Sequence, residues 1–327
     1  MNLHFKIAGT GSFVPAKVIS NADLSHMVDT SDEWITERTG IKERRMANEG
    51  QGSARMAYHA SLRALKQAKT EAKDLDIIIF GTVTPDFYMP SAACILQDQL
   101  GAKKALAFDI SAACSGFLYS LVIAESLVKQ GKGKKALVVG ADTLSKFTDY
   151  SDRSTCILFG DGAGAVVLSS GRRDCGLVSW RLYSDGSRWG LLNIPGGGSV
   201  YPPADKTLMK RMHFIKMNGR KIFKFAVKLM VDAAEEVLDD AGLDIRDVDL
   251  FIPHQANIRI IESVVRNLRI DKDKVFVNLA LYGNTSAASI PIALDEAVRK
   301  GRVKKGDRVL LASFGSGLTW GAVLLRW

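Results

Sequence analysis

Residues 73–81 read KDLDIIIFG, and residues 246–254 read RDVDLFIPH. Each stretch places two aspartates, one residue apart, just before a run of mainly apolar residues, so that Asp247 of the second stretch corresponds to Asp74 of the first. A short apolar run after polar residues is typical of a strand that is buried on both faces. Two such stretches so far apart in the chain indicate a diverged internal repeat.

Two further pairs of segments support this duplication. In the first pair, VKQG at 128–131 and the strand-like run 136–140 are repeated as VRKG at 298–301 and the run 308–312. In the second pair, GAVVL at 164–168 is repeated as GAVLL at 321–325. Apolar strands that alternate with amphipathic helices predict mixed sheets covered by helices, which is an α/β layer architecture. We therefore expect two pseudo-symmetric halves, residues 1–173 and 174–327.

The composition narrows the class of protein. The chain has 327 residues, of which 47% are hydrophobic, and a formal net charge of +9. No stretch predicts a signal peptide or a membrane span, and four cysteines without CxxC spacing predict neither a disulfide framework nor a zinc site, so we expect a cytoplasmic protein. The positive charge favours an anionic partner, such as a phosphorylated cofactor or an acidic carrier. Nucleic acid is disfavoured because no nucleic-acid-binding signature accompanies the charge.

Cys114 lies where an apolar strand-like run, 104–110, passes through 111–113 into a helix-like stretch that ends near Gly131. The unpaired N–H groups at the start of a helix favour a thiolate and lower the pKa of a cysteine. Cys114 is therefore a candidate nucleophile. The alternative for Cys114 is the small buried hydrophobe that a free cysteine usually is.

The repeat connects Cys114 to two residues of the second half. Gly131 and Gly301 mark equivalent helix ends in the two halves, and the same separation along the chain carries Cys114 to Asn284 in LYGNTS at 281–286. His254 ends the first strand of the second half. If a pseudo-two-fold axis relates the halves, all three residues converge near it. His254 alone would be a structural histidine and Asn284 alone a helix cap, but together with a helix-capping thiol they favour catalysis.

Six motifs distributed over nearly the whole chain carry a family resemblance. They are TSDEWI at 30–35, RTGI at 38–41, DISAACSGF at 109–117, HQAN at 254–257, GNTSAAS at 283–289 and FGSGLTWG at 314–321. Together they resemble β-ketoacyl-acyl-carrier-protein synthase III. The resemblance implies the five-layered α-β-α-β-α thiolase fold, a homodimer, and the decarboxylating condensation of an acyl-CoA with malonyl-acyl carrier protein at the start of type II fatty acid synthesis. Acetyl-CoA is the default starter substrate, and neither a metal nor a permanently bound cofactor is implied.

The resemblance also implies catalytic roles. Cys114 takes the acyl group from CoA and holds it as a thioester, which gives ping-pong kinetics, while His254 and Asn284 act as neutral donors to the enolate that decarboxylation forms. The backbone N–H groups of Cys114 and Ser316 form a second oxyanion hole. Ser316 departs from the glycine or alanine common at this position, and we expect it to be tolerated if its φ is negative. The alternative for 315–317 is a tight turn without a catalytic role.

Further site residues follow from the resemblance alone. The matching positions for binding CoA are Thr30, Trp34, Arg38, Arg153 and Asn257; those for the acyl pocket are Leu144, Phe159 and Met89, the last reaching in from the opposite subunit; and those for docking the carrier protein are Lys224, Arg259 and Arg266. Met89 is flexible enough to close over acetyl or to move aside for a longer or branched starter.

Three classes of function stay open at this point. The first is the priming synthase of fatty acid elongation, and the second is another enzyme of the thiolase superfamily, such as a polyketide starter synthase, a hydroxymethylglutaryl-CoA synthase or a chalcone-synthase-like enzyme. The third is a non-catalytic binding protein. Asn284 disfavours the elongating synthases, which use Cys-His-His, and also hydroxymethylglutaryl-CoA synthases. The presence of all three catalytic residues disfavours a binder.

Overall fold

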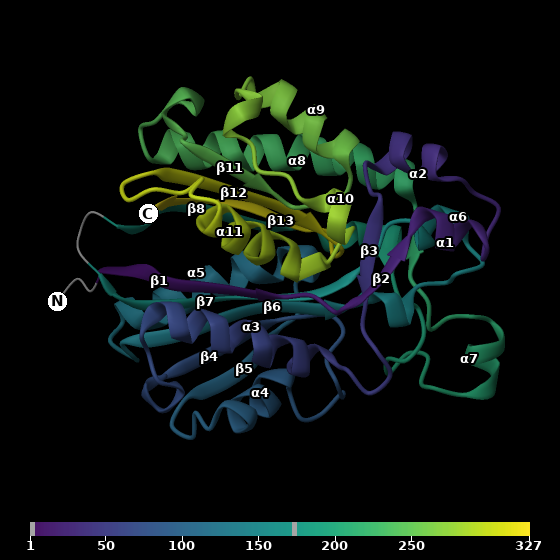
Figure 1. Ribbon diagram of the computed structural model, residues 1–327, viewed down its shortest axis with the longest axis horizontal. Helices are drawn as coiled ribbons and strands as arrows, with labels where there is room; N and C mark the ends of the chain where they lie inside the picture. Colours follow the sequence, from purple (N-terminus) through teal and green to yellow (C-terminus); the bar gives the residue numbers. More distant parts are fainter. Residues whose placement is uncertain (1–3, 172–174) are drawn as a thin grey trace.

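The computed structural model describes residues 4–171 and 175–327 of the chain. The boundary between the two expected halves, at residues 173 and 174, lies outside the described residues. The large sheet of five strands is built from strands before this point, and the large sheet of four strands from strands after it (Figure 1). No helix in the described ranges is long and apolar enough to cross a membrane.

The first large sheet has five strands in the order β1-β7-β6-β4-β5. Strands β4, β5 and β6 run parallel to one another, whereas β7 is antiparallel to both β1 and β6. The strands are β1 (His4–Phe13), β4 (Ile77–Gly81), β5 (Leu106–Ile110), β6 (Lys135–Thr143) and β7 (Asp161–Gly171). Every residue of β4 is buried, as its apolar sequence predicts.

The second large sheet has four strands in the order β11-β12-β13-β8. They are β8 (Gly176–Ser184), β11 (Leu250–Pro253), β12 (Arg308–Gly315) and β13 (Thr319–Arg326). Strand β11 is parallel to β12 and is the counterpart of β4 in the first sheet. Where β5 lies beside β4 in the first sheet, only an isolated parallel bridge between Phe251 and Val275 lies beside β11.

The same backbone contact joins β4 to β6 in the first sheet and β11 to β12 in the second. Oδ2 of Asp76 accepts the backbone N–H of Lys135 at 3.0 Å, and Oδ2 of Asp249 accepts that of Arg308 at 2.8 Å. In both pairs the aspartate N–H also donates to the partner's carbonyl at 3.0 Å. The second aspartate of each DxD triplet thus fixes the register of β4 against β6 and of β11 against β12.

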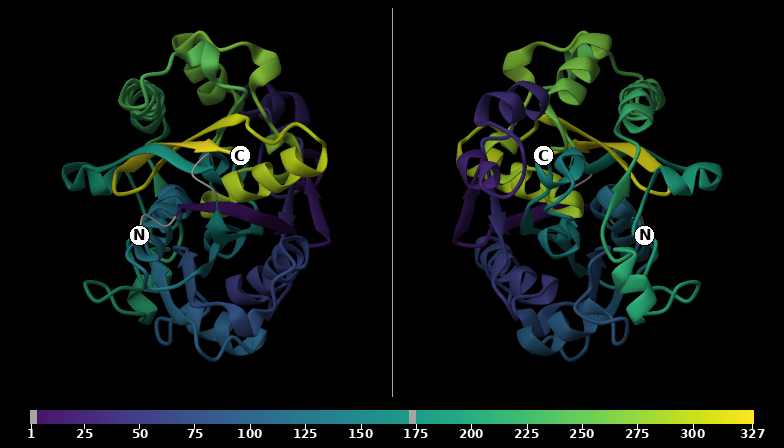
Figure 2. Two further views of the ribbon diagram at one scale, coloured as in Figure 1. Left: turned by 90° about the vertical axis from the view of Figure 1, so that its left-hand side faces the viewer. Right: turned by 90° about the vertical axis from the view of Figure 1, so that its right-hand side faces the viewer.

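Helices cover the sheets in three layers, and the five-layered α-β-α-β-α arrangement is confirmed (Figures 1 and 2). Helices α3 and α4 cover the outer face of the first sheet, α5 and α11 lie between the sheets, and α8 and α9 form the opposite outer layer. Their bounds are α3 (Ser53–Ala68), α4 (Ala92–Leu100), α5 (Gly116–Lys129), α8 (Gly219–Asp240), α9 (Ile258–Leu268) and α11 (Ser289–Arg299). Three hydrophobic clusters fill the spaces between these layers.

Shorter elements surround one end of the layers. They are α1 (Asn21–Ser25), α2 (Asp32–Thr39), α6 (Arg153–Cys156), α7 (Asp205–Met209), α10 (Leu279–Tyr282), the pair β2 (Lys17–Ser20) and β3 (Glu43–Met46), and the pair β9 (Leu192–Asn193) and β10 (Lys216–Met217). Helix α2 contacts α9, and β9 with β10 continues toward the start of α8. Of these elements, α2, α6, β9 and β10 contribute residues to the walls of the cavities described below.

Two short 3-10 helices precede the central pair of helices. They are η2 (Ala113–Ser115), which leads into α5, and η7 (Ser286–Ala288), which leads into α11. Each begins with a residue of positive φ, +46° at Ala113 and +51° at Ser286. The structural counterpart of Cys114 is therefore Ala287, and the correspondence with Asn284, inferred from the separation of the helix ends, is wrong. Helix α11 is three residues shorter than α5, which accounts for the different separation of the helix ends.

Candidate active site

The turn between β5 and α5 presents Cys114. The hydroxyl of Ser313 donates to the Cys114 carbonyl at 2.8 Å, and Gly315 lies so close that a Cβ on it would come within 2.7 Å of the Cys114 nitrogen. Cys114 is partly exposed, yet the protein around its sulfur raises the thiol pKa to about 12 because burial disfavours the charged form. The expectation that the helix start lowers this pKa is wrong, since burial outweighs the hydrogen bond from Ser286 that lowers it.

His254 follows directly after β11. Its backbone N–H donates to Ala312 O at 2.8 Å, and its ring Nδ1 lies 2.6 Å from the hydroxyl of Ser289, the first residue of α11. The side chain is only 4% exposed, and burial lowers the pKa of His254 to about 3. The imidazole is therefore neutral at physiological pH, and its orientation is fixed through Nδ1.

Asn284 is held by its backbone and by its side chain. Its N–H donates to Leu158 O at 2.8 Å, and its carbonyl accepts from Gly160 N at 3.0 Å. The side-chain Oδ1 accepts the backbone N–H of Ser286 at 2.8 Å. Because the amide oxygen is engaged in this way, the NH₂ group is the part of Asn284 that is available to a ligand.

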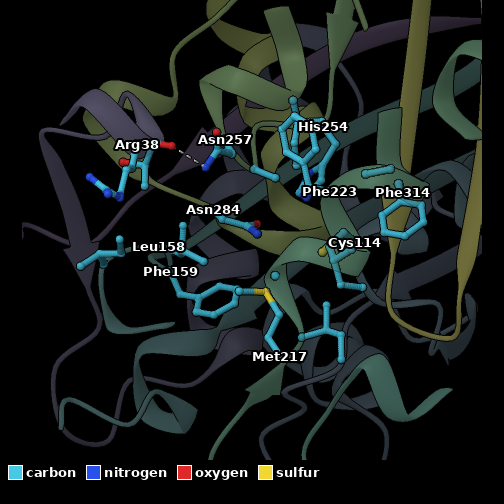
Figure 3. Close-up of a pocket in the computed structure, with 18 of the residues that line it drawn as sticks. Arg38, Cys114, Leu158, Phe159, Met217, Phe223, His254, Asn257, Asn284 and Phe314 are labelled. Atoms are coloured by element: carbon cyan, nitrogen blue, oxygen red, sulfur yellow. Dashed lines mark hydrogen bonds between the residues drawn. The ribbon is translucent and has the colours of Figure 1, made fainter. Parts of the chain in front are cut away.

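Cys114, His254 and Asn284 line one cavity of about 660 Å³ (Figure 3). Phe159, Phe223 and Phe314 contribute apolar surface to the same cavity. The residues that line this cavity come from different parts of the chain, and the topology brings them together. Figure 3 shows the sulfur of Cys114 and the amide of Asn284 pointing into the same space, with the ring of Phe314 beside Cys114.

A second cavity, of about 380 Å³, also reaches Cys114. Leu144, Phe159 and Ser316 line it, and Phe159 also lines the first cavity. Cys114 thus lies between two hollows, one bordered by α2 and the start of α9 and the other lined mainly by apolar side chains. This arrangement suits a nucleophile that receives an acyl chain from one side and stores it on the other.

Ser316 has the negative φ that we expected a serine at this position to need. It is not among the described residues with positive φ, whereas Gly317 has a φ of +138°. Its hydroxyl donates to the carbonyl of Leu192 and is therefore engaged in a hydrogen bond. Met89 is 84% exposed and lines neither of the two cavities that contain Cys114.

Three of the five residues expected to bind CoA line the first cavity. Trp34, Arg38 and Asn257 line it, and the amide of Asn257 donates to Arg38 O at 3.0 Å. Arg153 does not line it, but its guanidinium carbon lies 4.7 Å from the Trp34 ring centroid, while that of Arg38 lies 4.2 Å away. The hydroxyl of Thr30 is buried without a hydrogen-bond partner and lines neither cavity.

The expected docking residues are exposed but do not form one cluster. Lys224 on α8 lines a shallow hollow with Arg188, Lys221 and Phe225. Arg259 lies in the first turn of α9, next to Asn257 at the cavity mouth. Arg266 lies two turns further along α9, in a separate hollow.

Sequence reasoning missed the residues that support the catalytic candidates. Ser286 and Ser289 stand within the GNTSAAS motif, yet nothing in their spacing distinguishes them from ordinary helix-start serines. Asp142 near the end of β6 carried no signal at all. No group of three or more His, Cys, Asp or Glu side chains within residues 4–171 and 175–327 is arranged to hold a metal.

Comparisons with known proteins identify the family. Residues 108–186 match the family described as 3-Oxoacyl-[acyl-carrier-protein (ACP)] synthase III. Residues 238–327 match the family described as 3-Oxoacyl-[acyl-carrier-protein (ACP)] synthase III C terminal. The β-ketoacyl-[acyl-carrier-protein] synthase III of Desulfitobacterium hafniense is 52% identical over 321 residues, 98% of this chain and 97% of that protein.

Solved structures agree with this result. The 3-oxoacyl-[acyl-carrier-protein] synthase III from Aquifex aeolicus is 51% identical, with a TM-score of 0.92 over 99% of this chain and 100% of that one. The priming β-ketosynthase from the R1128 polyketide biosynthetic pathway is 35% identical, with a TM-score of 0.91 over 99% and 97%. This chain therefore belongs to the β-ketoacyl-[acyl-carrier-protein] synthase III family and is an acyl-transferring condensing enzyme.

Proposed function

We propose that this enzyme condenses an acyl-CoA starter, by default acetyl-CoA, with malonyl-acyl carrier protein and so initiates type II fatty acid synthesis. The products are a 3-oxoacyl-acyl carrier protein (acetoacetyl-acyl carrier protein for the default starter), CoA and carbon dioxide. The observation that carries this proposal is the position of Cys114 between two cavities, the larger of which it shares with His254 and Asn284.

In the first half-reaction Cys114 attacks the thioester carbon of the acyl-CoA. The thiol proton leaves the sulfur, a new S–C bond forms, the S–C bond to CoA breaks, and the CoA sulfur takes up a proton. The acyl chain then occupies the smaller cavity, against Leu144 and Phe159. Because CoA departs before the second substrate reacts, the kinetics are ping-pong.

CoA itself is bound at the mouth of the larger cavity. The flat indole of Trp34 and the guanidinium groups of Arg38 and Arg153 are suited to stack on an adenine ring and to pair with phosphates. Asn257 lies at the mouth, at the start of α9. The hydroxyl of Thr30 is buried away from this cavity, so the proposal gives Thr30 no direct contact with CoA. CoA acts as a substrate here, and no resident cofactor or metal enters the proposal.

In the second half-reaction malonyl thioester loses carbon dioxide and forms an enolate. Two neutral donors receive the negative oxygen: the NH₂ group of Asn284, and the ring nitrogen of His254 opposite Nδ1. The donors are rigid before the charge develops, which is the condition for effective electrostatic stabilisation. The carbanion then attacks the acyl carbon on Cys114, and the S–C bond breaks as the new C–C bond forms.

The carbonyl oxygen of the acyl group needs donors of its own during that attack. The backbone N–H groups of Cys114 and Ser316 supply them in this proposal. The close approach of Gly315 to the Cys114 nitrogen supports it, because the two turns that carry these N–H groups are in contact. The negative φ of Ser316 lets a serine occupy the position without backbone strain.

Two protein partners complete the proposal. An acidic acyl carrier protein is drawn to Lys224, Arg259 and Arg266, which lie on the two helices whose first turns border the cavity mouth. A second copy of this chain brings its Met89 to the smaller cavity. The edge strand β5, on which Leu106 is 54% exposed, offers a surface for that homodimer.

A starter-unit synthase of polyketide biosynthesis is the second candidate. The R1128 priming β-ketosynthase supports it, since it shares the fold at 35% identity. The two candidates differ in the acyl group that is loaded and in the pathway that uses the product.

Intact-mass analysis after mixing the enzyme with acetyl-CoA, and separately with longer and branched acyl-CoAs, tests the proposal. We expect a mass increase of one acyl group on the wild type and none on Cys114→Ser, and the best-loaded chain identifies the starter. Absence of loading from every acyl-CoA would overturn the priming function. Product formation with malonyl-CoA as readily as with malonyl-acyl carrier protein would overturn the assigned carrier.

A further inference from the structure

Side-chain hydrogen bonds join the turn that carries Cys114 to the turn that carries Ser316. The hydroxyl of Ser313 donates to the Cys114 carbonyl at 2.8 Å. The hydroxyl of Thr319 lies 2.9 Å from the carbonyl of Ala112 and 3.1 Å from that of Ser316. The two turns are therefore held against each other beside the catalytic sulfur.

The hydroxyl of Ser316 extends this network to a third part of the chain, because it donates to the backbone carbonyl of Leu192 in β9. Strand β9 is two residues long and forms a sheet of two strands with β10, in which Met217 lies opposite Leu192. A sheet of only two strands is marginally stable by itself. The bond from Ser316 therefore contributes to where Leu192 lies.

Leu192 stands at the border between the two cavities. Cys114, Phe159 and Leu192 are the residues that line both of them. Leu192 also packs against a buried cluster of Phe159, Leu144 and Ile215, and all three of these residues line the smaller cavity. An acyl group that extends from the sulfur into the smaller cavity therefore lies beside Leu192.

We propose that the hydroxyl of Ser316 positions Leu192 at this border and thereby restricts the length and branching of the acyl group that the enzyme loads. The inference rests on the proposed function of the same site. It gives the two parts of Ser316 separate tasks. The backbone N–H serves the oxyanion, whereas the side chain is a positioning group that acts on the acyl chain through Leu192.

The size of the effect follows from two physical limits. An apolar pocket with fixed walls discriminates by about 10- to 200-fold for one methylene group, and this discrimination weakens when a wall is free to move. One hydrogen bond to a backbone carbonyl changes an equilibrium by between about twofold and about tenfold. Loss of the Ser316 hydroxyl should therefore relax the choice of starter without abolishing it.

A second contact keeps the loss of the hydroxyl local. The backbone N–H of Asp185 donates to Leu318 O at 2.9 Å, and the N–H of Leu318 donates to Asp185 O at 2.8 Å. This pair holds the segment that leads toward β9 against the same turn. Removal of the Ser316 bond therefore frees β9 and leaves the preceding segment anchored.

The hydroxyl itself is a poor direct contact for an acyl chain, although Ser316 lines the smaller cavity. A serine hydroxyl has one proton, and that of Ser316 is donated to Leu192. A saturated acyl chain offers no acceptor for it. The route through Leu192 is therefore the one that the contacts support.

Ser316→Ala removes the hydroxyl, and alanine adopts the negative φ of this position without strain. Quenched intact mass gives the second-order rate constants for loading of Cys114 by acetyl-CoA, hexanoyl-CoA and isovaleryl-CoA. We expect the ratios of hexanoyl to acetyl and of isovaleryl to acetyl loading to rise about fivefold over the wild type. A weakened oxyanion hole slows all three thioesters alike, so it does not move these ratios.

Ser179→Ala is the matched control. The hydroxyl of Ser179 in β8 also joins two elements, since it donates to the backbone carbonyl of Val237 in α8 at 2.6 Å, but Ser179 lines neither cavity that contains Cys114. We expect the wild-type ratios in this variant. Equal rises in Ser179→Ala and Ser316→Ala would overturn the assignment to Ser316.

A double-mutant cycle tests the route through Leu192. Leu192→Ala keeps the backbone carbonyl but removes the side chain that Ser316 positions, so the ratios should rise, and Ser316→Ala should add little to that rise. The same rise from Ser316→Ala with and without the Leu192 side chain would overturn the route. Ratios within about 1.5-fold of the wild type in Ser316→Ala alone would overturn the inference as a whole.

Hydrogen exchange separates this inference from the proposed function, because it needs neither CoA nor carrier protein. Peptides that contain β9 and β10 should exchange about fivefold faster in Ser316→Ala than in the wild type or in Ser179→Ala. Unchanged exchange would show that Ser316 does not hold β9 and would overturn the inference. Failure of the wild type to accept an acyl group from any CoA thioester would overturn the proposed function, and with it the role in starter choice, whatever the exchange shows.

Discussion

Oδ1 of Asn284 accepts the backbone N–H of Ser286 at 2.8 Å. The contact orients the amide, so that its two N–H bonds and not its oxygen are free for a ligand. It also ties the side chain that we propose binds the enolate to Ser286, which lines the smaller cavity together with Cys114. The donor and the nucleophile are therefore positioned by the same short turn.

Asn284→Asp should abolish the donor while keeping the contact to Ser286. A carboxylate still accepts the Ser286 N–H, but it repels the enolate oxygen, so decarboxylation of malonyl-acyl carrier protein should fall by at least about 10²–10³-fold. Carbon dioxide release measures the loss. Loading of Cys114 from acetyl-CoA should change much less.

The loading measurement is the internal control for Asn284→Asp. Loss of both reactions together with a lower melting temperature would indicate a disturbed turn. Decarboxylation near the wild-type rate in a well-folded variant would remove Asn284 from the proposed mechanism.

Burial of neutral His254 predicts a pH dependence of stability. Its pKa is 6.5 without perturbation and about 3 in the folded protein. Because the folded value is the lower one, the contribution to stability is fully present above pH 6.5 and is lost as the pH falls toward 3. Between pH 6.5 and about pH 5 the loss should reach about 2 kcal/mol.

Denaturant unfolding of the wild type and of His254→Gln at both pH values measures this contribution. Glutamine does not titrate, so the difference in free energy of unfolding between the two proteins should change by the stated amount. Carboxylates titrate alike in both proteins and cancel. Parallel pH profiles would mean that His254 is not kept neutral by burial.

The sequence predicted the architecture because the segments that repeat are buried strands. The runs at β4 and β11 are apolar on both faces, and the aspartates before them make identical contacts in the two sheets. Such positions tolerate little change, so their pattern survives divergence. Helix α11 was free to lose three residues relative to α5, and this loss misplaced the counterpart of Cys114 by three positions.

The electrostatics of the site could not be read from the sequence in the same way. The helix start after Cys114 predicted a lowered thiol pKa, but the pKa depends on how deeply the surrounding loops enclose the sulfur. The segments around the sulfur lie far apart in the sequence, such as those that carry Ser286 and Gly315. Asp142 was invisible for the same reason, since its partners are assembled by tertiary structure.

The guanidinium groups of Arg38 and Arg153 approach the Trp34 ring to 4.2 and 4.7 Å. If the indole stacks on the adenine of CoA, Arg153→Ala should raise KM for acetyl-CoA about tenfold with little change in kcat, because the lost contact is remote from the reacting carbon. Arg153→Lys should not restore binding, since an ammonium group lacks the flat face of a guanidinium.

Arg55→Ala is a matched control for this test. Arg55 also lies over an aromatic ring, that of Tyr58 at 5.4 Å, but on α3 and outside both cavities that contain Cys114. We expect unchanged steady-state kinetics for this variant. An unchanged KM in Arg153→Ala would exclude Arg153 from the CoA site.

Charge reversal on α8 tests the carrier-docking surface. Lys224→Glu should lower kcat/KM for malonyl-acyl carrier protein about tenfold at about 50 mM salt, and the gap should narrow at about 300 mM salt, since ions screen exposed charges. Initial rates at varied carrier concentration give this ratio. Lys66→Glu, on α3 in the opposite outer layer, makes the same change in net charge away from the cavity mouth and should leave the ratio unchanged. An equal loss in the two variants would show that net charge, and not a docking site at Lys224, governs the encounter with the carrier.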